Sequence, residues 1–435
     1  MYAADALAEY GAKVDVFDRL PVPFGLVRYG VAPDHVSIRS VRDTLDKIWD
    51  NDDIRFVGNV DVGTDVSVEE LREAYDAVIL TYGASADRRL GIEGEDLDGS
   101  VAATDFVAWY TGHPAYEGPD FGTLLSDVRS VAVIGVGNVA VDVVRVLSKS
   151  PEELSATDMP DHVLATLAAA PVEQVHLIGR RGPAQASFTT KELKELGELQ
   201  DCDVHVRPDD LELDPISQAD LEASKVAARN LTLLREWSER VARTDVPGRI
   251  DLYFFTRPAR ILGTDKVEAL EIERTAFDEN GRLVATGEST RIPVDLVVRS
   301  VGYRGRPLGP VPFDEDRGVI PNSEGRVLDK EQAIPGLYVA GWIKRGPTGI
   351  IGTNKKCAVG TVASLLTDLE SGALEVTDRT GEVDFVERLA ADNVAVVTTP
   401  GWRAVDAEER KRGGERGKDR LTIHEYEELL AIAGR

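Results

Sequence analysis

Short apolar runs alternate with longer amphipathic stretches along most of the chain, which is typical of strands that alternate with helices. Several runs are apolar at every position, as expected of parallel strands covered on both faces. The pattern predicts strands at 14–17, 77–81, 130–134, 174–178, 204–206, 251–255, 296–300 and 337–340. It predicts helices at 3–10, 37–49, 139–148, 189–198, 220–243 and 423–431. This alternation favours an α/β fold built on parallel sheets.

Two segments of the chain share one pattern. Asp76–Gly83 and Asp295–Gly302 each run from an aspartate through an apolar strand to a glycine. This weak repeat predicts two nucleotide-binding domains, with glycine-rich crossings between them at 91–99 and 304–312. The middle domain would then be inserted into the first. The Gly- and charge-rich stretch 410–420 is expected to be a solvated connector.

The composition is that of a folded protein that repels polyanions. The 435 residues are 43% apolar and 29% charged, and 50 Lys and Arg against 76 Asp and Glu give a net charge of −26. Such a field repels nucleic acid and anionic membranes, and no apolar run approaches the ~20 residues of a membrane span. We therefore expect neither a nucleic-acid partner nor stable membrane insertion.

The two cysteines, Cys202 and Cys357, stand far apart in a sequence without a CxxC motif. They provide no disulfide framework, dithiol redox centre or zinc site. They also exclude a flavin subunit that carries its own iron–sulfur cluster, because such a cluster takes several cysteine ligands. We expect no metal site and a reducing, cytoplasmic compartment.

The strongest local motif follows the predicted strand 130–134, where Gly135-Val-Gly137-Asn-Val-Ala140 leads into a helix. Gly135 permits a tight turn, Gly137 lets a pyrophosphate approach the backbone, and Ala140 allows the helix to pack closely on the strand. The phosphates would lie at the helix N-terminus. This context favours a dinucleotide site over an ordinary strand-to-helix turn.

The next predicted strand, 174–178, is followed by Gly179-Arg180-Arg181 at the place where NAD-binding folds carry an acidic residue. Two guanidinium groups suit a 2′-phosphate, because arginine binds phosphate through paired hydrogen bonds. The arginines predict NADP rather than NAD. A solvated charged turn is the alternative interpretation.

A second nucleotide site is indicated by Asp18, which closes the predicted strand 14–17. In a βαβ unit an acidic residue at this place binds a ribose, and its glycine-rich turn lies about 20 residues upstream. The sequence begins too late to contain that turn. An ordinary surface aspartate is the alternative.

Two long segments then carry a family resemblance. They are Leu20-Pro-Val-Pro-Phe-Gly-Leu-Val-Arg-Tyr-Gly-Val-Ala-Pro-Asp-His35 and Gly341-Trp-Ile-Lys-Arg-Gly-Pro-Thr-Gly-Ile-Ile-Gly-Thr-Asn-Lys-Lys356. With Arg180-Arg181-Gly-Pro, Ser300-Val-Gly-Tyr-Arg-Gly305 and Gly401-Trp402-Arg403, the chain resembles the bacterial branch of the adrenodoxin reductase family of ferredoxin–NADP reductases over nearly its whole length.

The resemblance implies two Rossmann-like domains, with an NADP domain at 87–306 inserted into an FAD domain formed by 1–86 and 307–435. It places FAD against Asp18, Leu26, Val62, Trp342, Gly349, Ile350 and Ile351. It places NADP against Gly135, Gly137, Asn138, Val139, Ala140, Arg180, Arg181 and Glu192. It implies catalytic polar groups near the flavin and nicotinamide at His35 and Glu195.

The implied function is electron transfer from NADPH through FAD to a ferredoxin, by a monomeric enzyme. The predicted helix 220–243 is a candidate ferredoxin contact, although its acidic residues favour a solvated helix with internal salt bridges. The basic residues concerned are Lys225, Arg229, Arg235, Arg240 and Arg243.

Two positions depart from the family pattern. Cys357 stands where the family commonly has an acidic residue, and a small buried hydrophobe is the interpretation given to it. Met1 aligns directly after the third glycine of the family's FAD motif, so the central strand of that domain is expected to lie upstream in a longer natural protein. The alternative function is an NADP-binding protein that lacks FAD because of this truncation.

Overall fold

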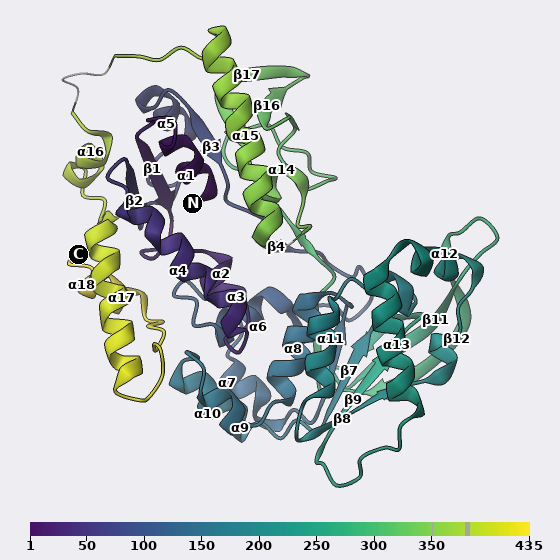
Figure 1. The fold of residues 1–435 in the computed structure, drawn as a ribbon. Helices are drawn as coiled ribbons and strands as arrows, with labels where there is room; N and C mark the ends of the chain where they lie inside the picture. Colours follow the sequence, from purple (N-terminus) through teal and green to yellow (C-terminus); the bar gives the residue numbers. More distant parts are fainter. Residues whose placement is uncertain (350, 379–382) are drawn as a thin grey trace. The chain divides into compact units, whose positions relative to one another are not determined.

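The computed structural model describes residues 1–349, 351–378 and 383–435, and the chain divides into two compact units (Figure 1). The first unit contains residues 1–31, 35–88 and 302–435, and the second contains 32–34 and 89–301. The junctions that the sequence predicts, after residues 86 and 306, lie a few residues away from these boundaries. The antiparallel pair β4 (Ala86–Asp87) and β14 (Tyr303–Arg304) lies where the chain passes from one unit to the other.

The second unit is built on a parallel sheet of six strands. Its order is β5 (Ser100–Ala102), β13 (Leu296–Arg299), β6 (Ser130–Ile134), β7 (Gln174–Ile178), β9 (Gly248–Tyr253) and β8 (Cys202–Val206). Five of these strands were predicted from apolar runs, and the parallel α/β architecture is confirmed. The chain runs from β6 to β7 on one side, while β13 pairs with β6 on the other. The carboxyl end of β6 is therefore a topological switch point.

Alternate residues of β6 face two different layers. Val131 and Val133 belong to a core formed with helices, whereas Ala132 and Ile134 pack against an antiparallel sheet. The helices on the first face include α6 (Ala103–Tyr110), α8 (Asn138–Ser148), α11 (Thr190–Gly197) and α13 (Lys225–Glu239). The antiparallel sheet consists of β10 (Thr256–Leu262), β11 (Ala269–Phe277) and β12 (Leu283–Pro293). Residues 256–293 were not predicted as strands.

The single long helix predicted at 220–243 is wrong. The chain forms α12 (Pro215–Ala223) and α13, separated at Ser224, whose backbone is extended. The Ser224 hydroxyl accepts a hydrogen bond from the Ala227 amide, so this residue caps a new helix instead of continuing the old one. Other short helices of the unit are α7 (Phe121–Leu124), α9 (Pro151–Ser155) and α10 (Asp161–Ala169).

The first unit contains two further sheets. One has the order β1 (Val14–Asp18), β2 (Ile54–Gly58) and β18 (Val397–Thr398). The other has the order β15 (Asn322–Ser323), β16 (Arg326–Asp329), β17 (Gln332–Val339) and β3 (Val78–Leu80). The main helices are α1 (Tyr2–Ala8), α2 (Leu26–Tyr29), α3 (Val36–Arg39), α4 (Val41–Asp46), α5 (Val68–Ala74), α14 (Trp342–Arg345), α15 (Ile351–Ser371), α16 (Phe385–Ala391), α17 (Thr399–Gly414) and α18 (Tyr426–Ile432).

Helix α1 contacts both sheets of this unit. Its residues Ala4 and Ala8 belong to a cluster with β1, and Leu7 packs beside the residues of β3. Among the described residues β1 pairs only with β2, and β3 pairs only with β17. Every residue of β1 is half-buried. Each sheet thus has an open edge next to α1, and the expected upstream strand stays a prediction.

The expectation of a solvated connector at 410–420 holds only for 414–419, most of which is exposed. Helix α17 continues to Gly414, and Arg420 is buried against Glu409 of that helix. Gly413 makes room for the backbone of Arg420, which a Cβ at this position would strike. In the described part of the chain, no helix combines the length and apolar character needed to cross a membrane.

Candidate functional site

The turn between β6 and α8 is tightly packed around Gly135. Its φ of +130° lies in the region that favours glycine, and a Cβ there would lie 2.9 Å from the carbonyl carbon of Ser300. The Gly135 amide donates to the Ile178 carbonyl, and the Ser300 amide donates to the Ile134 carbonyl. The ends of β13, β6 and β7 therefore fix the start of the glycine-rich turn.

The N-terminus of α8 follows at Gly137, and no side chain caps it. By contrast, Thr189 caps α11 through its hydroxyl. Asn138 uses its side-chain oxygen to accept from the Thr189 amide at 2.9 Å, which joins the beginnings of the two helices. Ala140 is fully buried and Val139 packs against the same core. The first amides of α8 can thus serve an anion.

Arg180 and Arg181 follow β7 with fixed backbones and exposed side chains. The Arg180 carbonyl accepts from the Thr275 hydroxyl at 2.6 Å, and the Arg181 carbonyl accepts from the Phe255 amide at 3.0 Å. Neither guanidinium makes a hydrogen bond or ion pair within the described ranges. The backbone of the two arginines is therefore held in place, while their positive charges are left to solvent.

Glu192 and Glu195 of α11 lie against Arg145 of α8, a residue that sequence reasoning missed. The fully buried Arg145 guanidinium lies 2.7 Å from Glu195 and 3.4 Å from Glu192, and it also pairs with Asp34 and Asp142. Arg145 and Asp142 are the two charged residues of α8, three positions apart among valines, and this was the available signal. The cluster contains more carboxylates than cations.

The pKa values of two carboxyls in this cluster diverge. Burial disfavours the charge of Asp34, but the attraction of Arg145 and Lys149 outweighs it and lowers the pKa to about 2. Burial, with the repulsion of neighbouring carboxylates, outweighs the pull of Arg145 on Asp142 and raises its pKa to about 8. Burial and like-charge repulsion therefore favour the neutral form of Asp142, whereas the cations favour the charged form of Asp34.

Asp18 ends β1 in the first unit with one oxygen engaged. Its Oδ1 accepts from the Leu20 amide at 3.0 Å, and Oδ2 has no hydrogen-bond donor among the described residues. Burial outweighs the effect of that hydrogen bond and raises the pKa of Asp18 to about 6. The half-buried carboxylate therefore has one oxygen available to accept hydrogen bonds from hydroxyl groups of a ligand.

Helix α14 and the loop after it carry buried donors without acceptors. Nε1 of Trp342 and both Nε and Nη1 of Arg345 are buried and have no partner within the part of the chain that the structure describes. The remaining Arg345 nitrogen holds the loop, donating to the Thr348 carbonyl and to Asn354 of α15. Gly349 has a φ of +84°, and Ile351 begins α15. Ile350 lies outside the described residues.

The other predicted residues of the first unit are scattered around these features. Leu26 is 54% exposed on α2, which leaves an apolar side chain available. Val62 is half-buried beside two hydrophobic clusters, and Trp342 stacks on Tyr303. His35 is buried at the start of α3. His35 belongs to the first unit and Glu195 to the second.

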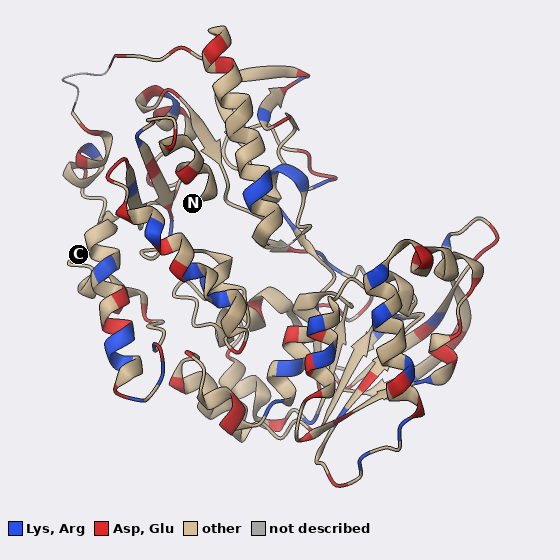
Figure 2. Ribbon diagram, in the orientation of Figure 1, with Lys and Arg blue, Asp and Glu red and all other residues tan. Residues whose placement is uncertain are grey.

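Helix α13 differs from the solvated, internally paired helix that its composition favoured. Arg240 pairs with Asp203 and Arg243 donates to carbonyls near β8, so both anchor the helix end. Lys225, Arg229 and Arg235 are exposed and form no ion pair in the described chain. Figure 2 colours the Lys and Arg positions of the ribbon blue and the Asp and Glu positions red. These three cations are available to a partner.

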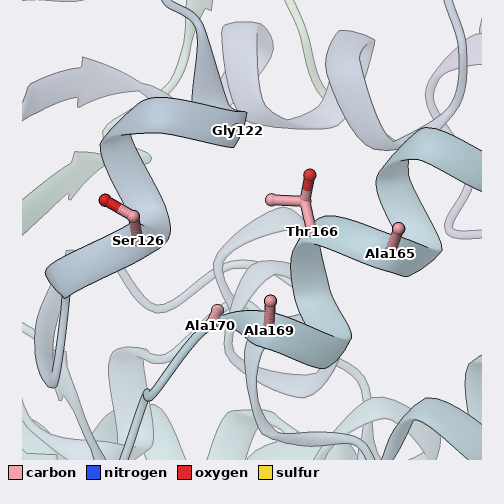
Figure 3. A pocket seen from close by; sticks show the side chains of 6 residues that line it. All are labelled: Gly122, Ser126, Ala165, Thr166, Ala169 and Ala170. Carbon is pink, nitrogen blue, oxygen red and sulfur yellow. The ribbon is translucent and has the colours of Figure 1, made fainter.

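A small pocket of the second unit carries no titratable side chain. It lies between α7 and α10 and is lined by Gly122, Ser126, Ala165, Thr166, Ala169 and Ala170 (Figure 3). The Ser126 hydroxyl already donates to the Thr123 carbonyl at 2.8 Å. The pocket has none of the chemistry found around Gly135 or Asp18.

Curated relatives match nearly the whole chain. It is 44% identical over 443 residues to an NADPH-ferredoxin reductase, FprA, of Mycobacterium tuberculosis, covering 99% of this chain and 94% of the relative. It is 38% identical to a mitochondrial NADPH:adrenodoxin oxidoreductase of Arabidopsis thaliana, covering 99% of this chain and 92% of the relative. The chain belongs to the adrenodoxin reductase family. No family model matches it.

A solved structure supports the same family at the level of the fold. Mycobacterium tuberculosis FprA in complex with NADPH superposes with a TM-score of 0.91 at 43% identity, covering 100% of this chain and 97% of that one. The adrenodoxin reductase fold therefore accounts for both units of this chain.

Proposed function

We propose that this member of the adrenodoxin reductase family transfers electrons from NADPH through FAD to a ferredoxin. The observation that carries the proposal is the combination of two exposed, unpaired arginines, Arg180 and Arg181, with a glycine-rich turn that leads into the uncapped N-terminus of α8. Relatives with NADPH and ferredoxin in their names support it over 99% of the chain. When bound, FAD supplies an acceptor for the hydride of NADPH and returns the electrons singly to a one-electron carrier.

The chain's own residues bind and orient the nucleotides. Gly135, Gly137 and the first amides of α8 hold the NADPH pyrophosphate, with Asn138, Val139 and Ala140 shaping that turn. Arg180 and Arg181 bind the 2′-phosphate. Glu192 and Glu195, which both contact Arg145, are proposed to face the bound nucleotide. Glu195 and His35 are the proposed catalytic polar groups.

The first unit holds FAD. Asp18 accepts hydrogen bonds from the ribose hydroxyls. The buried N–H groups of Trp342 and Arg345 that lack an acceptor fit a ligand rich in carbonyl and phosphate oxygens. Glycines with positive φ at 341, 346 and 349 let the backbone approach the flavin ring of FAD. Leu26, Val62 and Ile351 supply apolar surface, and Ile350 is proposed by sequence alone.

Ferredoxin is the proposed electron acceptor, and the protein is proposed to act as a cytoplasmic monomer. At a net charge of −26 an acidic ferredoxin is repelled at long range. The unpaired cations Lys225, Arg229 and Arg235 on α13 offer the local attraction that docking requires.

The test is the reduction of ferredoxin without oxygen, monitored through the absorbance of ferredoxin itself. With the protein, FAD and NADPH present, ferredoxin should be reduced, and omission of any component should abolish reduction. NADPH binding without electron transfer in the presence of FAD would favour the flavin-free alternative.

Asp18 gives the flavin-free protein a specific pH dependence. Folding raises its pKa from 3.8 to about 6, so the stability contributed by the protonated carboxyl is fully present below pH 3.8 and is lost as the pH rises through 6. The free energy of unfolding should fall by up to about 3 kcal/mol across this window. Asp18→Asn should remove that step.

Urea unfolding of both proteins at about pH 4 and about pH 7 measures the difference. The other titratable groups are the same in the wild-type protein and in Asp18→Asn. Only the additional pH-dependent change in the free energy of unfolding of the wild-type protein is therefore assigned to Asp18. An identical pH dependence in the two proteins would show that Asp18 is not desolvated.

A further inference from the structure

The C-terminal tail, defined as residues 399–432, packs on the segment that follows β1. Trp402 of α17 is fully buried, and Phe24 meets its ring edge-on at a centroid distance of 5.4 Å. Phe24 itself has a φ of +84°, which a non-glycine residue adopts only where its surroundings fix it. The tail therefore contacts a segment whose backbone is held in an unfavourable conformation.

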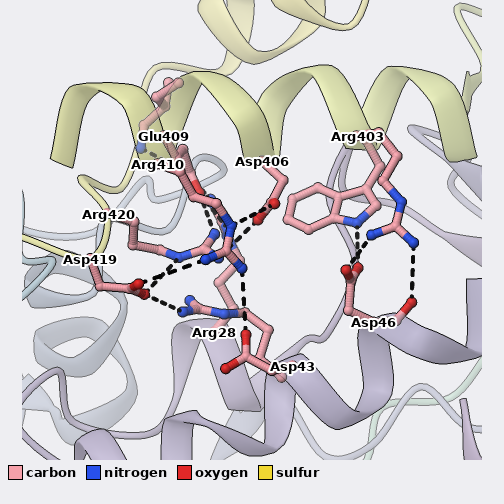
Figure 4. Close-up of polar contacts among 12 residues, drawn as sticks. Arg28, Asp43, Asp46, Arg403, Asp406, Glu409, Arg410, Asp419 and Arg420 are labelled. Carbon is pink, nitrogen blue, oxygen red and sulfur yellow. Dashed lines mark hydrogen bonds and ion pairs between the residues drawn. The ribbon is translucent and has the colours of Figure 1, made fainter. Parts of the chain in front are cut away.

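A buried ionic centre joins the same two parts (Figure 4). Arg28 donates to both carboxylate oxygens of Glu409, one at 2.9 Å, and Arg420 donates to Glu409 at 3.1 Å. The Ile423 amide donates to the other Glu409 oxygen at 2.9 Å. Removing either Arg28 or Glu409 by substitution would leave the other charge buried without its partner, which is strongly unfavourable.

Further contacts fix α17 beside α4. Trp402 Nε1 donates to Asp46 at 3.0 Å, and Arg403 pairs with Asp46 and Asp50. Arg410 lies 3.5 Å from Asp43. These contacts set the position of the helix that carries Glu409.

A second anchor lies directly beside Asp18. The Tyr426 hydroxyl of α18 lies 3.2 Å from the Arg19 carbonyl and also contacts the side-chain oxygen of Asn59. Tyr29 lies within electrostatic reach of Arg28, Glu409 and Asp18, and burial raises its pKa to about 12. The tail thus contacts the segment from Asp18 to Tyr29 near both of its ends, at Arg19 and at Arg28.

We propose that the C-terminal tail positions the FAD-binding segment 18–29, with Glu409 and Tyr426 as positioning residues. The proposal rests on the proposed function, because it assumes that Asp18 and Leu26 meet the flavin nucleotide. The tail touches neither nucleotide in this proposal. It keeps the Asp18 carboxylate and the exposed Leu26 in the arrangement that binding requires.

The test compares Tyr426→Phe with Tyr338→Phe. The Tyr338 hydroxyl donates to Asp368 at 2.9 Å in the same unit, so the control also removes one tyrosine hydroxyl. Tyr426→Phe should raise the FAD dissociation constant about fivefold and leave NADPH affinity unchanged. Tyr338→Phe should change the FAD dissociation constant by less than about twofold.

Amide hydrogen exchange supplies a readout that needs no flavin. Exchange in residues 18–29 should quicken about fivefold in Tyr426→Phe and stay unchanged in Tyr338→Phe. A uniform loss of thermal stability in both variants, with equal FAD affinity and equal exchange, would overturn the proposal. A wild-type protein that binds no FAD would overturn the proposed function instead, whatever the exchange result.

Glu409→Gln extends the comparison to the ionic centre. Because it leaves the buried Arg28 guanidinium with a neutral partner, while Arg420 keeps its contact with Asp406, it should quicken exchange in 18–29 more than Tyr426→Phe does. If Glu409→Gln does not fold, Tyr426→Phe still decides the outcome.

Discussion

Replacing Arg180 and Arg181 together with glutamine should raise the KM for NADPH by about 100-fold and change the KM for NADH by less than about threefold. Both guanidiniums are exposed and unpaired in the described chain, so their loss removes attraction to the 2′-phosphate and breaks no internal contact. NADH lacks that phosphate, so its KM should not depend on the two arginines. Steady-state kinetics with ferricyanide as acceptor measures both constants.

The matched control is the double variant Arg229→Gln and Arg235→Gln. It removes the same charge from exposed, unpaired arginines of the same unit. Its KM for NADPH should stay within about twofold of wild type, because long-range charge is screened by salt. An equal rise in both double variants would mean that net charge, and not a 2′-phosphate site, governs NADPH affinity.

Gly135→Ala should be strongly damaging to both the stability and the NADPH affinity of the second unit. Its φ of +130° is unfavourable for alanine, and the new Cβ would press on the backbone carbonyl of Ser300, which directly follows β13. We expect a loss of at least about 3 kcal/mol in the free energy of unfolding, together with loss of measurable NADPH affinity. Urea unfolding and NADPH titration measure the two effects.

Gly360→Ala provides the comparison for this glycine. It lies within α15, its φ is not in the left-handed region, and a Cβ there would meet no atom within 4 Å. Alanine at this helical site should stabilise the protein by up to about 1 kcal/mol. Gly135→Ala with wild-type stability and wild-type NADPH affinity would show that the turn tolerates a side chain and does not hold the pyrophosphate closely.

The nucleotide-binding elements could be predicted because their signals are local. The strand 130–134 and the strand 174–178 are confirmed with the predicted bounds, since each is an apolar run that ends at a glycine. The backbone need for glycine at 135 is also local, and its φ bears this out. The sequence signals of these features are local, although the close approach of Ser300 to Gly135 is visible only in the fold.

Other features depend on residues far apart in the sequence. Arg28 and Glu409 are 381 positions apart, so no local pattern indicated that 410–420 would fold back as part of a buried centre. The sheet at 256–293 was missed because β12 is largely exposed and carries a polar sequence. Ser224 interrupts the predicted long helix through a side-chain cap that composition alone does not show.

The Arg145 cluster shows the same limit within the candidate site. Glu192 and Glu195 were assigned through the family, and their shared contact with a buried arginine came only from the structure. The orphaned donors of Arg345 and Trp342 likewise required coordinates, because satisfaction of a hydrogen-bond donor is a property of the folded chain.

The most direct measurement is the visible absorption spectrum of the purified protein with FAD, recorded without oxygen before and after NADPH is added. We expect flavin bands that stay with the protein on gel filtration, bleach with NADPH, and bleach far more slowly with NADH. A protein that retains no flavin, or whose flavin bleaches equally fast with NADH and NADPH, would contradict NADPH-dependent electron transfer through FAD.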